Sequence, residues 1–207
     1  MVSYKLYYFP IRGPAEVARQ LFALSKTPYE DIRITMEEWP KHKADMPFEK
    51  MPVLAIDGYM LPESFAINRY LARKFGYAGK TSLEEATVDA LADQMKDYNT
   101  EARPYFTALY LKKPEEEIEK IKTETYMPAA NKMFGFLEKY LKKSKSGFFA
   151  DSGLTWIDLF VADHFTTLLG WDSHILDDHK ELAELRNKVI SIPEIKEWIE
   201  KRPETFV

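Results

Sequence analysis

Cysteine is absent from all 207 residues of this chain. A chain without cysteine can form no disulfide bond, no thiolate metal site and no cysteine nucleophile. Any chemistry at sulfur that this protein performs must therefore use a thiol that another molecule brings to it.

Long apolar runs and an excess of basic charge are absent too. No apolar stretch approaches the length of a membrane-spanning helix, the first residues form no signal-peptide pattern, and no cysteine at the end could carry a lipid. The formal charge of −4 offers no broad basic field for nucleic acid or an anionic membrane. We therefore expect a cytoplasmic protein that binds neither nucleic acid nor membranes.

Metal-ligand patterns are scarce as well. The four histidines are dispersed and show none of the close spacings at which two histidines share a metal ion: His42, His164, His174 and His179. We predict no metal site. The chain does contain 45% hydrophobic and 14% aromatic residues, which is ample for a buried core and excludes general disorder.

Short strands and helices alternate in the first part of the chain. The aromatic run at residues 4–9 predicts a buried strand, and Gly13-Pro14 then opens a helical stretch. A second strand is expected around residues 32–34, a hairpin around Asp57-Gly58, and a helix from Glu63-Ser64 onward. This βαβ and ββα order predicts a small mixed sheet covered by helices.

Only helical periodicity follows the short glycine-containing segment at residues 76–82. Thr155-Trp156-Ile157-Asp158 has the form of a helix capping box. Apolar residues lie on expected inner helix faces, namely Val88, Leu91, Ala92 and Met95, and later Phe134, Leu137, Tyr140 and Leu141. We predict a mixed domain at residues 1–79, a linker at 80–82 and an all-helical domain at 83–207.

The segment from Tyr8 to Pro14 stands where redox proteins of thioredoxin-like architecture carry a Cys-x-x-Cys motif. Together with later motifs, this segment resembles the cytosolic glutathione transferases along the whole chain. More narrowly, the sequence is similar to the sigma class, which includes nematode members and is related to glutathione-dependent prostaglandin D synthase. The motifs are Tyr4 to Phe9, Met51-Pro52-Val53-Leu54, Leu71-Ala72-Arg73, Thr155 to Asp158, and Arg202-Pro203-Glu204-Thr205. The resemblance implies a thioredoxin-like domain followed by an all-helical domain.

In the family that this sequence resembles, a tyrosine after the first strand hydrogen-bonds the sulfur of glutathione, and Tyr8 is the matching residue. A free thiol has a pKa of about 8.5 and is mostly protonated at neutral pH. One hydrogen bond to the thiolate contributes roughly 1.5 to 3 kcal/mol, enough to lower that pKa by about one to two units. The alternative is that Tyr8 is only a strand aromatic that fills the core.

The resemblance also implies a set of contacts to glutathione, the co-substrate. Met51 and Pro52 match a cis-proline turn that pairs its main chain with the tripeptide, and Ser64 after Glu63 matches the site of the γ-glutamyl carboxylate. The alternatives are an ordinary trans turn and a plain helix cap.

Three further residues match the site of the glycyl carboxylate, namely Trp39, Lys43 and Lys50. Asp97 matches an acid that sigma enzymes extend from the second subunit of a homodimer toward the γ-glutamyl ammonium. Solvated surface is the alternative for the lysines and for Asp97. Asp93 and Asp97 also resemble a divalent-ion site of some sigma members, but Lys96 replaces one of its acids, so we still expect no metal.

The second, hydrophobic substrate is expected between the two domains, at positions that match the hydrophobic pocket of the family: Phe9, Tyr105, Phe160 and Val207. Each of these residues could instead belong to the core. Pro14 departs from the arginine that vertebrate prostaglandin D synthases carry, which argues against prostaglandin-specific activity unless Arg12 or Arg103 compensates.

The resemblance therefore implies a glutathione transferase that conjugates the glutathione thiolate to hydrophobic electrophiles for detoxification, with peroxidase activity as a further reaction. The alternatives are a glutathione-dependent prostaglandin-H2 D-isomerase, a non-catalytic carrier of haem or hydrophobic ligands, and a structural protein related to lens crystallins. A carrier would need the pocket but would not need Tyr8.

Overall fold

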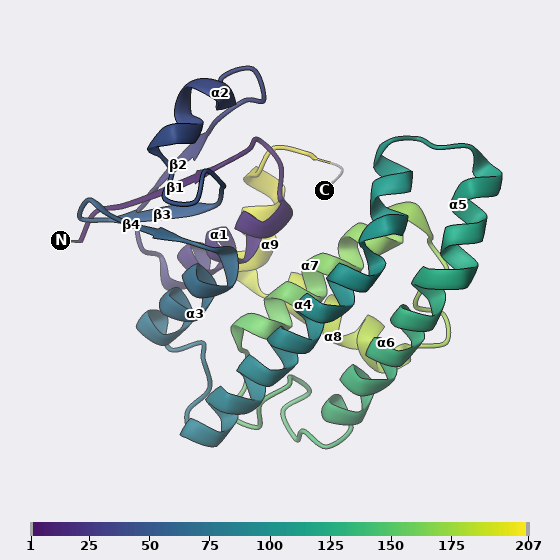
Figure 1. Ribbon diagram of the computed structural model, residues 1–207. Coiled ribbons are helices and arrows are strands. Elements are labelled where there is room, and N and C mark those ends of the chain that lie inside the picture. The colour runs from purple at the N-terminus through teal and green to yellow at the C-terminus, as the bar shows by residue number, and fades with distance from the viewer. Residues whose placement is uncertain (1, 206–207) are drawn as a thin grey trace.

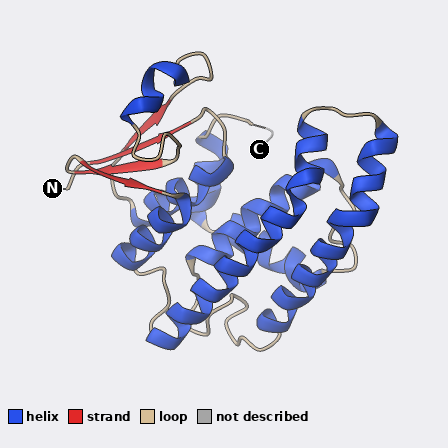
Figure 2. Ribbon diagram, viewed as in Figure 1, coloured by secondary structure: helices blue, strands red, loops and turns tan. Residues whose placement is uncertain are grey.

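The computed structural model describes residues 2–205, which form two lobes of different make-up (Figure 1). All the strands lie in one lobe, while the other lobe consists of helices and loops (Figure 2). This arrangement confirms the predicted fold class, a thioredoxin-like sheet domain followed by an all-helical domain.

The first lobe contains a four-stranded mixed sheet with the strand order β2-β1-β3-β4. β1 is parallel to β2 and antiparallel to β3, and β3 turns back into the antiparallel β4. The elements of this lobe are β1 Tyr4–Tyr8, α1 Glu16–Ser25, β2 Glu30–Arg33, α2 Trp39–His42, β3 Val53–Ile56, β4 Tyr59–Pro62 and α3 Ser64–Phe75. Their order is the predicted βαβ and ββα.

Helices α1 and α3 cover one face of this sheet, and α2 lies on the other side (Figure 1). Tyr4, Leu6 and Tyr8 alternate with less buried neighbours along β1, because successive side chains of a strand point to opposite faces. Burying one such large apolar side chain stabilises the fold by roughly 1.5 to 3 kcal/mol. The strand that ends at Tyr8 is therefore firmly anchored between the helices and the rest of the sheet.

The second lobe is a bundle in which α4 is the longest helix. Its helices are α4 Ser82–Tyr110, α5 Glu115–Ile121, α6 Met127–Leu141, α7 Trp156–Trp171, α8 Lys180–Ile190 and α9 Pro193–Lys201. The predicted inner face of α4 is buried. On α6 the prediction was wrong for Tyr140, which is 39% exposed because it lies in the last turn of the helix and borders a surface hollow. None of the helices in residues 2–205 combines the length and the apolar character needed to cross a bilayer.

The start of α7 is fixed by the predicted capping box. One carboxylate oxygen of Asp158 accepts hydrogen bonds from the N–H and the hydroxyl of Thr155, both at 2.7 Å. The other oxygen accepts the Phe149 N–H at 2.9 Å. Asp158 and Thr155 are both fully buried, so this carboxylate satisfies donors that water cannot reach.

Contacts between helices join the two lobes. α1 packs against α7 and α9, and Arg69 of α3 bonds Asp89 of α4 at 2.9 Å. The connection between α3 and α4 runs from Phe75 to Ser82, and the hydroxyl of Thr81 caps α4 by accepting the Glu84 N–H. The predicted linker at residues 80–82 lies at the end of this connection, and the division of the chain there stays a prediction.

Candidate active site

Tyr8 lies at the end of β1, and its side chain is pressed against the turn that leads into α1. A Cβ atom at Gly13 would lie 2.9 Å from the Tyr8 hydroxyl oxygen, and Gly13 has a φ of +43°. Both facts require glycine at this position, since a side chain would clash with the phenol and strain the backbone. Among the residues that the structure describes, the Tyr8 hydroxyl has no hydrogen-bond partner, and it is not among the enclosed polar atoms.

The surroundings of Tyr8 keep its hydroxyl protonated. Burial raises the pKa of Tyr8 to about 12, and the positive charge of Arg19 partly opposes that rise. The Arg19 guanidinium carbon lies 5.9 Å from the centre of the Tyr8 ring. A neutral phenol that keeps its proton can donate a hydrogen bond to an anion but cannot act as a base at neutral pH.

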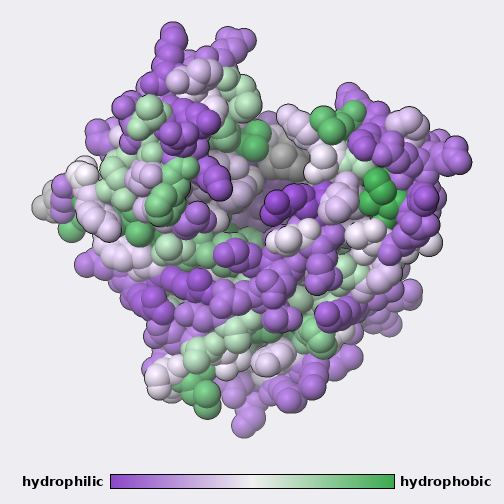
Figure 3. All heavy atoms as spheres, viewed as in Figure 1, coloured by the Kyte–Doolittle hydropathy of each residue, from purple (hydrophilic) through white to green (hydrophobic). Residues whose placement is uncertain are grey.

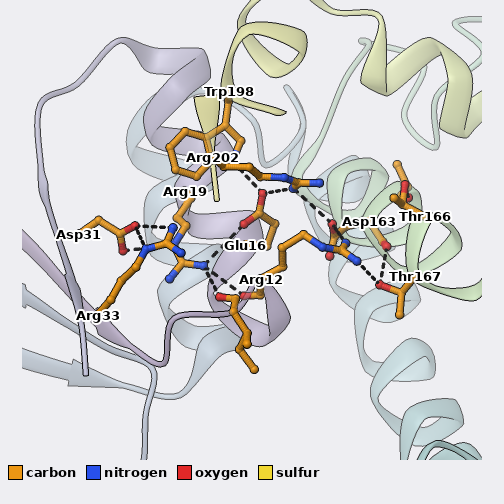
Figure 4. Close-up of polar contacts among 12 residues, drawn as sticks. Arg12, Glu16, Arg19, Asp31, Arg33, Asp163, Thr166, Thr167, Trp198 and Arg202 are labelled. Atoms are coloured by element: carbon orange, nitrogen blue, oxygen red, sulfur yellow. Dashed lines mark hydrogen bonds and ion pairs between the residues drawn. The ribbon is translucent and has the colours of Figure 1, made fainter. Parts of the chain in front are cut away.

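Arg19 also holds the turn that packs against Tyr8. Its side chain is completely buried, and it donates to the carbonyl oxygens of Ile11 at 2.7 Å and of Arg12 at 3.2 Å. Asp31 of β2 balances the charge, at 3.1 Å from Arg19 Nε. Figure 4 shows how these groups converge beneath the turn.

A second part of the same polar network crosses between the lobes (Figure 4). Arg12 donates to Asp163 of α7 at 2.6 Å and to the Thr167 hydroxyl at 3.0 Å. Glu16 of α1 accepts the Trp198 indole N–H at 2.7 Å and a hydrogen bond from Arg202. The Arg12 guanidinium is therefore directed at α7, and Arg103 lies exposed on α4.

Three predicted glutathione contacts lie just before β3 and at the start of α3, namely Met51, Glu63 and Ser64. The Met51–Pro52 peptide bond is cis. Within residues 2–205, the N–H and C=O of Met51 form no hydrogen bond. Ser64 is the first residue of α3, and its half-buried side chain lines a cavity. Glu63 precedes it with a φ of +72° and an exposed side chain, which makes no capping hydrogen bond.

The other predicted glutathione contacts lie on the surface around this site. Trp39 of α2 packs edge-on against Phe9, with ring centres 5.6 Å apart. Lys43 pairs with Glu49 at 3.5 Å while half exposed, and Lys50 is exposed. Asp97 lies exposed on α4, in a hollow that α6 also borders, and is not part of the cavity wall.

A cavity of about 360 Å³ lies between the lobes, where the molecular surface is hollowed (Figure 3). Ile11, Gly13, Pro14, Val17, Ser64 and Phe65 line it from the first lobe. The second lobe contributes residues of α4 and α7, namely Asn99, Phe106, Phe160, Asp163, His164, Thr167 and Trp171. Gly13, which touches the Tyr8 hydroxyl, is thus also part of the cavity wall.

The predicted pocket residues are not all brought together. Phe160 lines the cavity, while Phe9 packs beside Tyr8 and Trp39. Tyr105 is buried and stacks on Tyr126 with ring centres 4.3 Å apart, and its neighbour Phe106 is the one that reaches the cavity. Val207 lies outside the described residues. The pocket roles of these four residues stay predictions.

Several wall residues escaped the sequence analysis, although a signal for them exists. His164, Thr167 and Trp171 follow Phe160 at spacings of three and four along α7, which place all of them on one helix face. Once Phe160 was assigned to the pocket, this periodicity predicts the others. Asn99 on α4 carries no comparable signal. Among residues 2–205, the structure brings together no group of acidic and histidine side chains that could hold a metal ion.

Comparisons with known proteins agree with this geometry. Residues 4–73 match the glutathione S-transferase N-terminal domain, and residues 101–202 match the glutathione S-transferase C-terminal domain. The probable glutathione S-transferase 9 of Caenorhabditis elegans is 46% identical over 205 residues, with 99% of both chains covered.

Solved structures have the same fold. A Nu-class enzyme from Haemonchus contortus superposes with a TM-score of 0.93 at 47% identity, covering 100% of both chains. A monomeric enzyme from Necator americanus gives a TM-score of 0.94 at 45% identity, covering 98% of both. Rat hPGDS, solved in complex with a quinoline, gives a TM-score of 0.86 at 36% identity, covering 99% of this chain and 100% of that one. The protein therefore belongs to the glutathione S-transferase family.

Proposed function

We propose that this protein transfers the thiolate sulfur of glutathione to hydrophobic electrophiles, and that Tyr8 activates the thiol. The observation that carries the proposal is a neutral phenol that has no hydrogen-bond partner within residues 2–205 and is held against the wall of an interlobe cavity. Such a phenol is a hydrogen-bond donor waiting for an acceptor, and a thiolate in the cavity would be that acceptor.

The proposed role of Tyr8 has a definite size. A hydrogen bond to a charged group contributes roughly 1.5 to 3 kcal/mol, which corresponds to lowering the thiol pKa by about one to two units. The glutathione thiol would then be largely ionised at neutral pH. The buried positive charge of Arg19, with its guanidinium carbon 5.9 Å from the centre of the Tyr8 ring, would also favour this anion.

For the rest of glutathione we propose the contacts that the sequence predicts. The unpaired N–H and C=O of Met51, next to Pro52, can pair with the peptide as an added strand would. Ser64 and the first turn of α3 suit the γ-glutamyl carboxylate, with Glu63 beside them, because a helix N-terminus attracts an anion. The glycyl carboxylate would lie near Trp39, Lys43 and Lys50, with Lys43 leaving Glu49 to meet it.

We propose a homodimer as the functional unit, with Asp97 extended toward the glutathione of the partner. Asp97 is exposed on α4, and large apolar side chains are exposed on both lobes, with Phe48 at 61% and Phe136 at 40%. Exposed apolar surface of this kind is typical of protein interfaces. Sedimentation equilibrium tests the proposal, and a monomer that retains full activity at assay concentration would overturn it.

The finer assignment is to a nematode-type branch related to the sigma class. We also propose that the protein is cytoplasmic and has peroxidase activity as a further reaction. The likeness to rat hPGDS supports the relation to that class and is the observation that favours prostaglandin isomerisation as a second candidate. Position 14 is proline in this chain, and the Arg12 side chain is directed at Asp163. Neither residue therefore supplies the arginine that vertebrate prostaglandin D synthases carry. Conjugation is therefore the stronger reading, and carriage of haem or another hydrophobic ligand would use the same cavity.

The decisive experiment compares wild type with Tyr8→Phe and Tyr7→Phe, each saturated with glutathione. Tyr7 is the matched control, because it loses the same hydroxyl from the opposite face of β1. We expect Tyr8→Phe to lower the turnover of a generic aromatic electrophile about tenfold to a hundredfold and to raise the pKa of bound glutathione by about one to two units. Tyr7→Phe should change neither. If Tyr8→Phe keeps both wild-type values, Tyr8 is not the activator.

A further inference from the structure

Two polar side chains in the cavity wall have no role in the structure described so far. One is His164 on α7, and the other is Asn99 on α4. Both come from the second lobe, whereas Ser64, the predicted glutathione contact in the described lining, comes from the first. The two side chains therefore belong to the wall that faces the second substrate.

His164 is held in place at one ring nitrogen and open at the other. Its Nε2 lies 3.2 Å from the Tyr98 hydroxyl, and the rings of Tyr98 and Phe106 pack edge-on against it, with ring centres 5.3 and 6.0 Å away. In the part of the chain that the structure describes, Nδ1 has no partner and is not among the enclosed polar atoms. Burial lowers the pKa of His164 to about 4, so the imidazole is neutral at physiological pH.

Asn99 follows Tyr98 on α4 and lines the same cavity. It is half-buried, and its side-chain amide forms no hydrogen bond with another residue in the 2–205 range. An asparagine amide offers both donors and an acceptor, and a neutral imidazole offers one of each. Between them, Nδ1 and the amide can therefore receive either a carbonyl or a hydroxyl group.

The charge of the wall restricts the ligand further. Asp163 is the carboxylate in the described lining, and Arg12 at 2.6 Å and Arg202 at 3.8 Å compensate its charge. Nothing in the described lining supplies a positive charge for a carboxylate ligand, and the remaining surface is mostly aromatic and aliphatic. A neutral oxygen suits this wall, because an anionic one would meet no uncompensated positive charge in the described lining and would be poorly solvated.

We propose that Asn99 and His164 form a polar subsite that selects, among hydrophobic electrophiles, those with an uncharged carbonyl or hydroxyl oxygen remote from the reacting carbon. This inference rests on the proposed function, because it assigns the cavity to the second substrate. It goes beyond that function because it names the class of electrophile that the second-lobe wall prefers and the two residues that would bind the oxygen of that electrophile.

The test uses a series of enones of equal chain length that share one Michael acceptor and differ at the far end, which is a methyl group, a methyl ketone or a carboxylate. Glutathione addition is followed for wild type, Asn99→Leu and His164→Phe. Asn131→Leu on α6 is the matched control, because it is the same change at an exposed helical position. The saturated ketones, which cannot react, are titrated in parallel by calorimetry.

We expect wild type to prefer the ketone over the methyl compound by about fivefold to tenfold in kcat/KM and in affinity, with the carboxylate last. Asn99→Leu and His164→Phe should each reduce the ratio of ketone to methyl kcat/KM several-fold, and Asn131→Leu should keep the wild-type ratio. The Asn99 side chain forms no hydrogen bond with the described residues, so its variant stays informative if His164→Phe folds poorly.

The inference is overturned if wild type treats the ketone and methyl compounds alike, if it prefers the carboxylate, or if Asn99→Leu keeps the wild-type preference. Those outcomes leave conjugation itself intact. If folded wild type adds glutathione to no member of the series and binds no saturated ketone, the proposed function fails and the subsite fails with it.

Discussion

The two walls of the interlobe cavity are built in different ways. Gly13 of the first wall, the Tyr8 phenol packed behind it and Arg19 beneath them lie within twelve residues of sequence, and their packing fixes the phenol. The second wall joins Asn99 of α4 to His164 of α7, which are far apart in sequence and meet only when the helices pack. Thiol activation thus depends on a local unit, while substrate selection depends on tertiary packing.

The polar groups of the two walls also differ in how they are used. Beneath the first wall, Nε and Nη1 of Arg19 donate to one carboxylate and two carbonyl oxygens, while Nη2 is enclosed without a hydrogen-bond partner among the described residues. On the second wall, the Asn99 amide and one nitrogen of His164 find no partner among the residues described. Satisfied groups hold a geometry, and unsatisfied groups beside a cavity are free to meet a ligand. The first wall is therefore built for positioning and the second for recognition.

The largest effect, on the free energy of unfolding, should come from destabilising the start of α7, the helix that carries His164. Asp158→Ala removes an acceptor from three buried donors at the start of α7, namely the Thr155 N–H, the Thr155 hydroxyl and the Phe149 N–H. We expect the free energy of unfolding, measured by urea titration, to fall by about 3 to 5 kcal/mol.

Asp178→Ala is the control for this change, because Asp178 is exposed and makes no hydrogen bond within the described chain. It should shift the stability by less than about 0.5 kcal/mol. Equal stabilities for the two variants would mean that α7 does not depend on its capping box.

A smaller effect, confined to the first wall, should follow from Gly13→Ala. The new methyl group would meet the Tyr8 hydroxyl oxygen at 2.9 Å and strain a backbone with a φ of +43°. We expect a tenfold to hundredfold loss of conjugation rate, equivalent to about 1.4 to 2.7 kcal/mol, in a protein that still folds. Steady-state kinetics and circular dichroism together check both halves of this expectation.

Gly135→Ala makes the same substitution in α6, where an added Cβ meets nothing within 4 Å. Activity should be unchanged there, with a gain in stability of about 0.5 to 1 kcal/mol from the better helix former. If Gly13→Ala keeps the wild-type conjugation rate, the reaction tolerates displacement of the Tyr8 phenol. The first wall would then not be distinguished from the second by its positioning role.

The smallest effect concerns pH and the second wall. His164 has a pKa of about 4 in the folded protein, lowered from 6.5 by burial. Between those values the unfolded chain binds more protons, so acid favours unfolding, and the stabilising difference is complete only above about pH 6.5. The stability of wild type relative to His164→Gln should therefore fall by about 1 to 2 kcal/mol from pH 7 to pH 5.

For His174→Gln we expect a pH dependence of stability with the opposite sign. The hydrogen bond to Asp177 raises the pKa of exposed His174, so its contribution to stability is present at low pH and lost as the pH rises. Urea titrations at several pH values give both difference curves. An imidazole signal of His164 that titrates near pH 6.5 in the folded protein would contradict the buried, neutral assignment.

How far the sequence predicts this molecule follows from the same contrast. The strand that carries Tyr8, the hairpin at Asp57-Gly58 and the Thr155 to Asp158 cap are local patterns, and each is present as predicted. The cavity wall is not local. Tyr105 and Phe106 have the same helical propensity, and only the rotation of α4 against its neighbours decides which ring reaches the cavity.

The polar network beneath the turn could not be predicted for a further reason. Arg12, Glu16 and Arg19 look like ordinary charged residues of a helix start, yet all three are buried because partners arrive from β2, α7 and α9. The sequence pattern of a single helix does not predict a charged partner that comes from a distant element. Buried charges of this kind become visible only when the distant elements are placed together.

The same network orders events during synthesis on the ribosome. Glu16 emerges early, but the indole of Trp198 and the guanidinium of Arg202, which its carboxylate binds, are made more than 180 residues later. Until then Arg19, 3.6 Å away in the same lobe, is beside one oxygen of this carboxylate, while the other oxygen still lacks the donors of Trp198 and Arg202. The Glu16 contacts that tie the thioredoxin-like lobe to the end of the chain can therefore form only after translation has nearly ended.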